Sequence, residues 1–144
     1  MPSRFTHERR IEFSDTDMAG IVHFANFFRF MESAEHAFFR SLGLELHQQG
    51  AGHVRGFARV HAECDYLRPL HYPDVVRVEL AVREKTESAL AYEFAFFDEK
   101  NGERPVARGS LKVVHVARGP DDERLRAAPM PKEVLERIAV AETP

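Results

Sequence analysis

The segment from Phe13 to Phe27 combines two carboxylates, a glycine turn and the start of an apolar helix. It places Asp15 and Asp17 two residues apart, with Gly20 between them and the helix. The N-terminus of a helix offers unpaired backbone N–H groups and the positive end of the helix dipole, both of which favour negative charge. A carboxylate beside such donors suits acyl transfer, because it can act on a carbonyl while the donors polarise the carbonyl oxygen.

Hydrophobic patterning predicts the elements that hold this segment. A helix is expected over about residues 25–42, and its apolar side chains cover so much of its circumference that it must be buried on several sides. Asn101-Gly102 predicts a hairpin, and Pro131 is expected to open a short terminal helix. Alternation of apolar and polar residues predicts five strands, at residues 5–13, 58–66, 76–83, 90–96 and 106–117. On the strand at 58–66, one apolar side is expected to carry Ala58, Val60, Ala62, Cys64 and Tyr66.

This order of elements predicts the fold class. One strand, one long buried helix and then four strands joined by short connections indicate an α+β fold, in which one antiparallel sheet wraps around a central helix. The length of 144 residues corresponds to a single domain spanning residues 1–144. The first and last strands are expected to form the open edges of the sheet, and open edges favour pairing with a second copy.

Composition narrows the function classes. A net charge of −3 and the absence of a Lys/Arg run argue against a nucleic-acid partner. The single Cys64 excludes an internal disulfide and is expected to be an inert, buried thiol. No Gly-x-Ser-x-Gly turn is present, which argues against a serine hydrolase. Without a signal pattern or a membrane-length apolar run, we expect a cytoplasmic protein that does not bind membranes.

The motif Phe13-x-Asp15-x-Asp17-x-x-Gly20-x-Val22, followed by an aromatic helix, resembles the 4-hydroxybenzoyl-CoA thioesterase family. The members of that family are acyl-CoA thioesterases with the hot-dog fold, and the resemblance extends over nearly the whole chain. It implies that the second aspartate of the motif, Asp17, is the catalytic carboxylate. It also implies a single hot-dog thioesterase domain whose active sites lie at a homodimer interface, with two dimers often forming a homotetramer.

The resemblance also implies a set of substrate contacts. The backbone N–H near Phe24 looks like the donor that polarises the thioester carbonyl, and Glu32 matches a helix position that lines the acyl pocket. Arg124 and Arg126 match a basic pair that contacts the nucleotide phosphates of coenzyme A. His23 is expected as a wall of the pocket or as a donor near the thioester.

Each of these residues also has a simpler interpretation. Asp17 could cap a turn or the helix, as aspartate often does, and Asp15 is expected to hold the loop by side-chain-to-backbone hydrogen bonds. Glu32 and Glu35 could be surface charges on the helix, and the arginine pair could be a solvated part of a charged loop. Asp15, Asp17 and His23 could bind a hard cation, but no fourth ligand follows at a fixed spacing. We therefore expect neither a metal nor a cofactor.

The predicted function is hydrolysis of an acyl-CoA or aroyl-CoA thioester to the free acid and coenzyme A. Asp17 would either attack the carbonyl to form a mixed anhydride or deprotonate an attacking water, and the sequence does not choose between them. Two alternatives remain. One is a thioesterase that acts on acyl carrier protein, whose pantetheine lacks the nucleotide phosphates. The other is a non-catalytic module that binds acyl-CoA.

Overall fold

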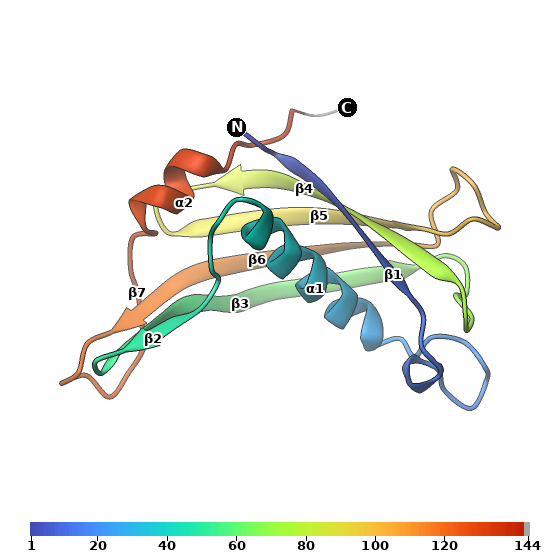
Figure 1. Cartoon of the computed structure of the whole chain (residues 1–144), viewed down its shortest axis with the longest axis horizontal. Coiled ribbons are helices and arrows are strands. Elements are labelled where there is room, and N and C mark those ends of the chain that lie inside the picture. Colours follow the sequence, from blue (N-terminus) through green and yellow to red (C-terminus); the bar gives the residue numbers. More distant parts are fainter. Residues whose placement is uncertain (143–144) are drawn as a thin grey trace.

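The computed structural model describes residues 1–142, which form one curled antiparallel sheet around a long helix (Figure 1). This is the predicted α+β architecture. A 3-10 turn at Phe13–Asp15 and two short strands were not predicted. The strands are β1 (Arg4–Arg10), β2 (Gln48–Gly50), β3 (His53–Tyr66), β4 (Val75–Lys85), β5 (Ala89–Phe97), β6 (Ala107–Arg118) and β7 (Arg126–Ala127); the helices are α1 (Asn26–Ser41) and α2 (Lys132–Arg137).

The strand order is β1-β4-β5-β6-β3-β2, and β7 pairs with the end of β6. The prediction that the last long strand forms an edge is wrong, because β6 lies between β5 and β3. Its interior position agrees with its apolar residues on both faces. One edge is β1. The other is β3, which β2 covers only along residues 53–55, so the rest of β3 has no outer neighbour among the described residues.

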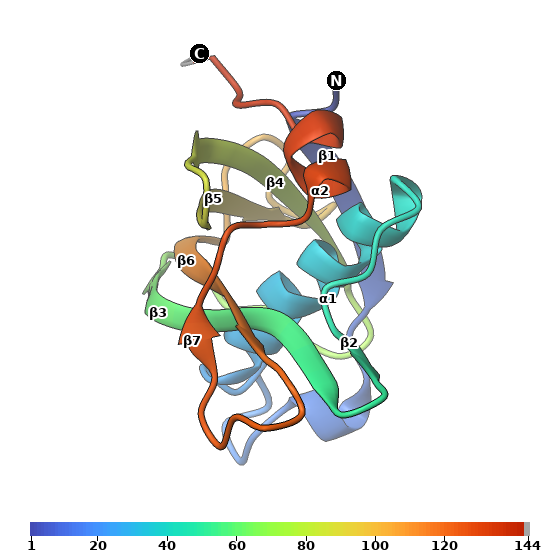
Figure 2. The ribbon, with the colours of Figure 1, turned by 90° about the vertical axis from the view of Figure 1, so that its left-hand side faces the viewer.

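Helix α1 lies in the concave side of the sheet and buries the face that carries most of its aromatic residues (Figure 2). Its buried side chains pack against the inward side chains of β4, β5 and β6. Gly109 on β6 permits this close approach, because a Cβ there would lie 2.7 Å from Sδ of Met31. Gly43 ends the helix with φ +71°, a conformation that favours glycine. The buried residues of α1 are Phe27, Phe30, Met31, Ala34, Glu35, Phe38 and Phe39.

Strand β3 does not keep the single alternation that the sequence predicts. Its pairing with β6 shifts between Arg59 and His61, which leaves Val60 as an extra, bulged residue. Before the bulge, Arg59 points toward α1, whereas Ala58 was expected on that side. The sequence pattern failed here because a one-residue bulge reverses which side chains face the core.

Glu35 is buried, so its interpretation as a surface charge is wrong. Its side chain is 0% exposed and forms an ion pair with Arg59, whose side chain is 29% exposed and also lies 3.3 Å from the Glu32 carboxylate. The hydroxyl of the buried Tyr92 faces the same carboxylate without closing a hydrogen bond of normal geometry. Burial raises the pKa of Glu35, while the Arg59 charge acts against that rise. The helix and the open-edge strand are thus joined by a buried ionic contact.

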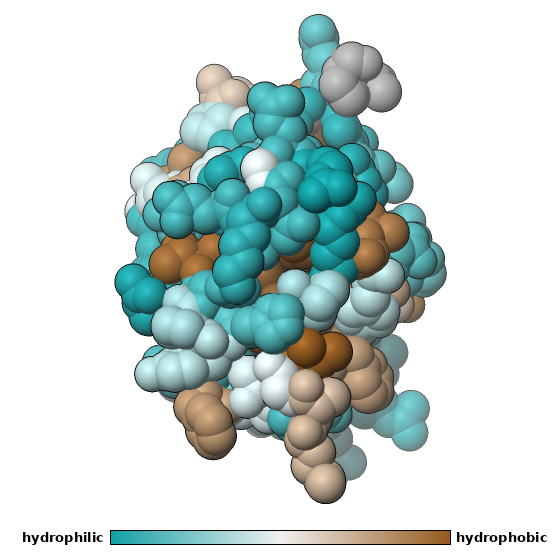
Figure 3. All heavy atoms as spheres, turned by 90° about the vertical axis from the view of Figure 1, so that its right-hand side faces the viewer, coloured by the Kyte–Doolittle hydropathy of each residue, from teal (hydrophilic) through white to brown (hydrophobic). Residues whose placement is uncertain are grey.

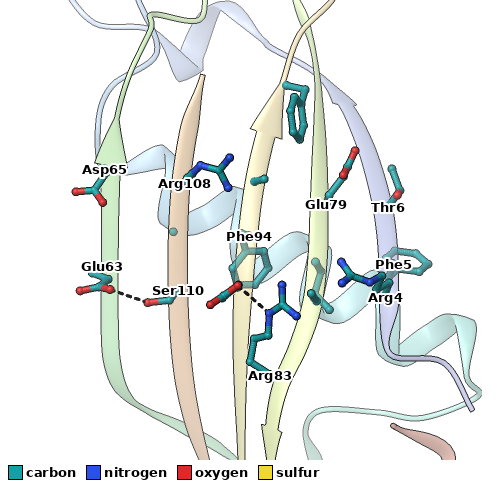
Figure 4. A pocket seen from close by; sticks show the side chains of 16 residues that line it. Arg4, Phe5, Thr6, Glu63, Asp65, Glu79, Arg83, Phe94, Arg108 and Ser110 are labelled. Atoms are coloured by element: carbon teal, nitrogen blue, oxygen red, sulfur yellow. Dashed lines mark hydrogen bonds and ion pairs between the residues drawn. The ribbon is translucent and has the colours of Figure 1, made fainter. Parts of the chain in front are cut away.

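The outer face of the sheet is polar and contains a hollow of about 510 Å³ (Figure 4). Several of its charged groups are paired with each other. Arg83 lies 2.8 Å from Glu93, and the Ser110 hydroxyl donates a hydrogen bond of 3.2 Å to Glu63. Among the described residues, no helix is long and apolar enough to cross a lipid bilayer.

The buried ion pair generates a stability prediction. Arg59→Met leaves the Glu35 carboxylate buried without its partner, so it should destabilise the fold by about 3–5 kcal/mol, the typical cost of breaking a buried pair. Glu35→Gln should cost less, because Arg59 can still reach water. Urea unfolding of both variants measures the difference.

The pH dependence of the Arg59→Met loss provides a check. With Arg59 absent, the pKa of Glu35 in the folded state lies further above its unfolded value of 4.5. The folded state then binds more protons than the unfolded state, so stability is retained below pH 4.5 and decreases as pH rises through the folded pKa. The loss should therefore be larger at pH 8 than at pH 5. A loss that does not change with pH would contradict a buried, uncompensated carboxylate.

Candidate functional site

The loop between β1 and α1 places an acid beside the start of the helix, as the sequence predicts. Within this loop Thr16 pairs with Val22, and the backbone N–H of Asp17 donates to the Ile21 carbonyl at 2.9 Å. The turn closes where the N–H of Gly20 donates to the Asp17 carbonyl at 2.9 Å. Gly20 has φ +81°, which a side chain would disfavour, so glycine fits this position.

Asp15 ties the loop together. Its carboxylate accepts the N–H of Glu12 at 2.8 Å and lies 3.5 Å from the Arg9 guanidinium. Its backbone carbonyl accepts the N–H of His23 at 2.9 Å and the side-chain amide of Asn26 at 2.8 Å. These contacts join β1, the loop and the first turn of α1. The geometry is that of a structural aspartate.

Asp17 has one oxygen in the turn and one that is free. Its Oδ1 accepts the N–H of Ala19 at 2.9 Å, whereas Oδ2 has no hydrogen-bond partner among the described residues. The residue is exposed and lines a pocket of about 520 Å³. The other lining residues are mostly apolar or aromatic: Ile21, Val22, Phe24, Phe27, Tyr66, Leu67, Arg68, Pro69 and Leu70. A carboxylate with a free oxygen at an apolar pocket can attack a bound carbonyl or take a proton from water.

Phe24 supplies a candidate donor at the same pocket. Its backbone N–H precedes the first turn of α1 and has no partner in the described part of the chain. Its carbonyl, in contrast, accepts the Tyr66 hydroxyl at 3.0 Å and the N–H of Phe27 at 3.3 Å. An unpaired N–H at a helix start can stabilise an oxyanion.

This end of the molecule also exposes apolar surface (Figure 3). Met18 and Phe13 are exposed on the loop, and Tyr66 and Leu67 are exposed where β3 ends. Large exposed apolar side chains gathered at one end mark a surface for a ligand or a partner.

His23 and Glu32, both predicted to bind substrate, do not line the Asp17 pocket. The His23 ring stacks on Phe24 with centroids 4.7 Å apart, and its Nδ1 accepts the N–H of Ala25 at 3.2 Å. Glu32 lies further along α1, where it contacts Arg59. It borders a separate hollow that also includes His7, Ser33, His36 and Arg40.

Arg124 and Arg126 lie at the opposite end of the sheet from Asp17 (Figure 1). Tyr66, at the pocket, pairs with Ala107 of β6, whereas Arg126 pairs with Ala117 of the same strand. Ten residues of extended strand span roughly 33 Å. Within one chain, the arginine pair and the carboxylate therefore do not form one site.

Only Asp17 and Phe24 of the lining residues are also predicted site residues, and the lining residues outside that prediction include two with polar side chains, Tyr66 and Arg68. The sequence pattern places Tyr66 only on the apolar side of a strand and assigns no role to Arg68. The Arg68 guanidinium donates to the Pro105 carbonyl and is the one cation among the lining residues. The turn that follows Tyr66, with Pro69, was the available signal, because loops after strand ends often carry functional residues.

Two candidates from the sequence remain, the Cys64 thiol and a cation site. Burial raises the pKa of the Cys64 thiol to about 11, so it is a poor nucleophile at neutral pH. Within residues 1–142, no group of three His, Cys, Asp or Glu side chains is placed to hold a metal ion.

Comparison with known proteins assigns this chain to a family. Residues 11–138 match the thioesterase-like superfamily. The chain belongs to that superfamily. The predicted resemblance is therefore confirmed, and with it the hot-dog fold and the class of acyl-CoA thioesterases.

The related proteins cover most of this thioesterase. A 1,4-dihydroxy-2-naphthoyl-CoA hydrolase of Crocosphaera subtropica is 30% identical over 77% of this chain and 81% of its own. The 4-hydroxybenzoyl-CoA thioesterase of Pseudomonas sp. strain CBS-3 is 28% identical over 94% of this chain and 98% of its own. The crystal structure of a 1,4-dihydroxy-2-naphthoyl-CoA thioesterase from Synechocystis superposes with a TM-score of 0.80 at 26% identity, covering 93% of this chain and 94% of that one.

Proposed function

We propose that this thioesterase hydrolyses an aromatic acyl-CoA and that Asp17 acts on the thioester carbonyl. The observation that carries the proposal is the pocket in which Asp17, with its free Oδ2, meets the unpaired N–H of Phe24. The rings of Phe24, Phe27 and Tyr66 line the same pocket, and a flat apolar acyl group suits such a wall. The relatives named above act on hydroxylated aroyl-CoA thioesters, which supports the same class here.

The proposed reaction needs only groups of the chain and water. Asp17 either attacks the carbonyl carbon, giving a mixed anhydride and coenzyme A thiolate, or removes a proton from the attacking water. The N–H of Phe24 stabilises the oxyanion that forms in either route. In the anhydride route water then attacks Cγ of Asp17, which releases the acid with one oxygen from Asp17 and restores the carboxylate with one oxygen from water. Single-turnover hydrolysis in oxygen-18 water distinguishes this route, because its first product carries no oxygen-18, whereas the general-base route places oxygen-18 in the product.

We propose that a second copy of the chain completes the site. The open edge of β3 beyond Arg55 can pair with the same edge of another chain. Antiparallel two-fold pairing sets the Tyr66 end of one strand beside the beginning of the other. The β7 segment of the second copy then approaches Asp17 of the first. Such a homodimer, alone or as a dimer of dimers, would hold the nucleotide phosphates with Arg124 and Arg126.

The role of Asp17 is tested by Asp17→Asn, which preserves the shape of the side chain and removes its basicity. We expect kcat on a hydroxybenzoyl-CoA to fall by about 10²–10⁴-fold or more, as for other catalytic acids and bases. Glu103→Gln, which changes an exposed carboxylate between β5 and β6, is the control and should keep normal turnover. Near-normal kcat in Asp17→Asn would refute the assignment. Tight binding without turnover by the unaltered protein would favour the non-catalytic module.

The role of the arginines is tested by the double change of Arg124 and Arg126 to alanine. Phosphate contacts lie far from the reacting carbonyl, so their loss should raise KM more than it lowers kcat. We expect an increase in KM of about tenfold or more on aroyl-CoA. Hydrolysis of the aroyl-N-acetylcysteamine thioester, which has no nucleotide, should stay normal. Equal damage on both substrates would indicate a structural role, and an unchanged KM on both would leave carrier-protein substrates as the better interpretation.

The shared site is tested by a mixed dimer of Asp17→Asn and the double arginine variant, co-expressed with two different tags. If Asp17 and the arginines of one site come from different chains, one of the two sites in the mixed dimer is entirely normal. We then expect half of the normal kcat with a normal KM. If each site is built within one chain, both sites are damaged and the mixed dimer resembles its parents. Sedimentation of the unaltered protein as a fully active monomer would also contradict a shared site.

A further inference from the structure

Tyr66 makes a tertiary contact to the backbone segment that carries the proposed oxyanion donor. Its hydroxyl, at the end of β3, donates to the carbonyl of Phe24 at 3.0 Å, although the two residues are 42 positions apart. Its ring meets Phe24 and Phe27 edge to face, with centroids at 6.4 and 5.2 Å. The hydroxyl and the ring therefore hold the same segment from two directions.

The other hydrogen bonds of the two peptide groups that meet at the Cα of Phe24 are local. The His23 carbonyl accepts the N–H of Asn26 at 2.9 Å, and the Phe24 carbonyl accepts the N–H of Phe27 at 3.3 Å. The second of these is longer than the usual 2.9–3.0 Å. Both lie within the turn that leads into α1, and the Asp15 carbonyl holds the two residues on either side of the Phe24–Ala25 segment, through the His23 N–H and the Asn26 side chain. The Tyr66 bond is anchored outside the turn, on the sheet.

This anchoring bears directly on the free N–H of Phe24. An oxyanion donor is effective when it is fixed in advance, because it then needs no reorganisation as charge develops. The carbonyl and the N–H of Phe24 belong to two peptide groups that meet at its Cα. A change in the backbone torsions of Phe24 that turned its N–H relative to the sheet would also move its carbonyl away from Tyr66. The Tyr66 bond opposes that change. Burial raises the pKa of Tyr66, so its hydroxyl remains a donor at neutral pH.

We propose that Tyr66 is a positioning residue: by holding the Phe24 carbonyl it restrains the backbone torsions of Phe24, and these set the direction in which the Phe24 N–H points toward the thioester carbonyl oxygen. This inference rests on the proposed function of the Asp17 pocket. It assigns to the end of β3 a role in the rate of the chemical step as well as in the wall of the pocket.

Tyr66→Phe removes the hydroxyl and keeps the ring contacts. We expect kcat to fall roughly tenfold, the scale of one neutral hydrogen bond, with little change in KM. Tyr72→Phe is the matched control, because Tyr72 is an exposed tyrosine of the same end whose ring packs on Phe13 and whose hydroxyl makes no hydrogen bond to the described residues. It should leave kcat unchanged. An unaltered kcat in Tyr66→Phe would overturn the proposal.

A spectroscopic measurement separates positioning from a general structural effect. In Asp17→Asn the substrate stays intact, so the carbonyl stretch of bound 4-hydroxybenzoyl-CoA can be measured by difference infrared spectroscopy with a carbon-13 carbonyl label. We expect the N–H of Phe24 to lower this frequency relative to solution. Adding Tyr66→Phe should move it part of the way back, whereas Tyr72→Phe should not.

The outcomes distinguish this inference from the function on which it rests. A frequency that does not respond to Tyr66→Phe, with kcat reduced, would make Tyr66 a structural residue and overturn the inference alone. If the frequency in Asp17→Asn already equals the solution value, the Phe24 N–H does not polarise the carbonyl. That result would refute the oxyanion donor of the proposed function. Retained activity in Asp17→Asn would instead refute the proposed role of that carboxylate.

Discussion

The packing of helix α1 against the concave face of a single sheet is the constraint on which the rest of the structure depends. The chain has one long helix and one sheet, so each must bury its apolar face on the other. The contact is close enough that a Cβ at Gly109 would lie 2.7 Å from Sδ of Met31, so Met31 would have to shift to admit it. Because the helix axis is fixed in this way, its first turn is fixed too, and the loop before it has a rigid base on which to hold Asp17.

The ends of two elements therefore meet at the pocket. The loop before α1 contributes the carboxylate and the free N–H, and the end of β3 contributes Tyr66 and Arg68. Asp15 joins the loop to β1 and to the first turn of α1, and Tyr66 joins it to the end of β3. Precise positioning on rigid elements is what an oxyanion donor requires, since a small misplacement already costs rate.

The same sheet separates other candidate residues from the pocket. Arg126 lies at the far end of β6, and Glu32 faces Arg59 on the side of the helix. The uncovered edge of β3 runs between these two regions. An open edge with unpaired backbone groups is a surface that another strand can extend. The buried Glu35–Arg59 pair lies at this edge and joins the helix to it, which gives the edge strand a defined position.

The sequence by itself determined the class of the fold, the approximate extents of α1, β4, β5 and β6, and the motif that contains Asp17. These features are local: a helical period, a twofold alternation and a turn with glycine are each written in consecutive residues. Tertiary structure alone decided which side chains meet. It reversed the alternation of β3 at Val60, because a bulge depends on pairing with β6. It buried Glu35 beside Arg59, placed Tyr66 on the Phe24 carbonyl and set Arg126 far from Asp17, because each of these relations joins residues that are distant in the chain.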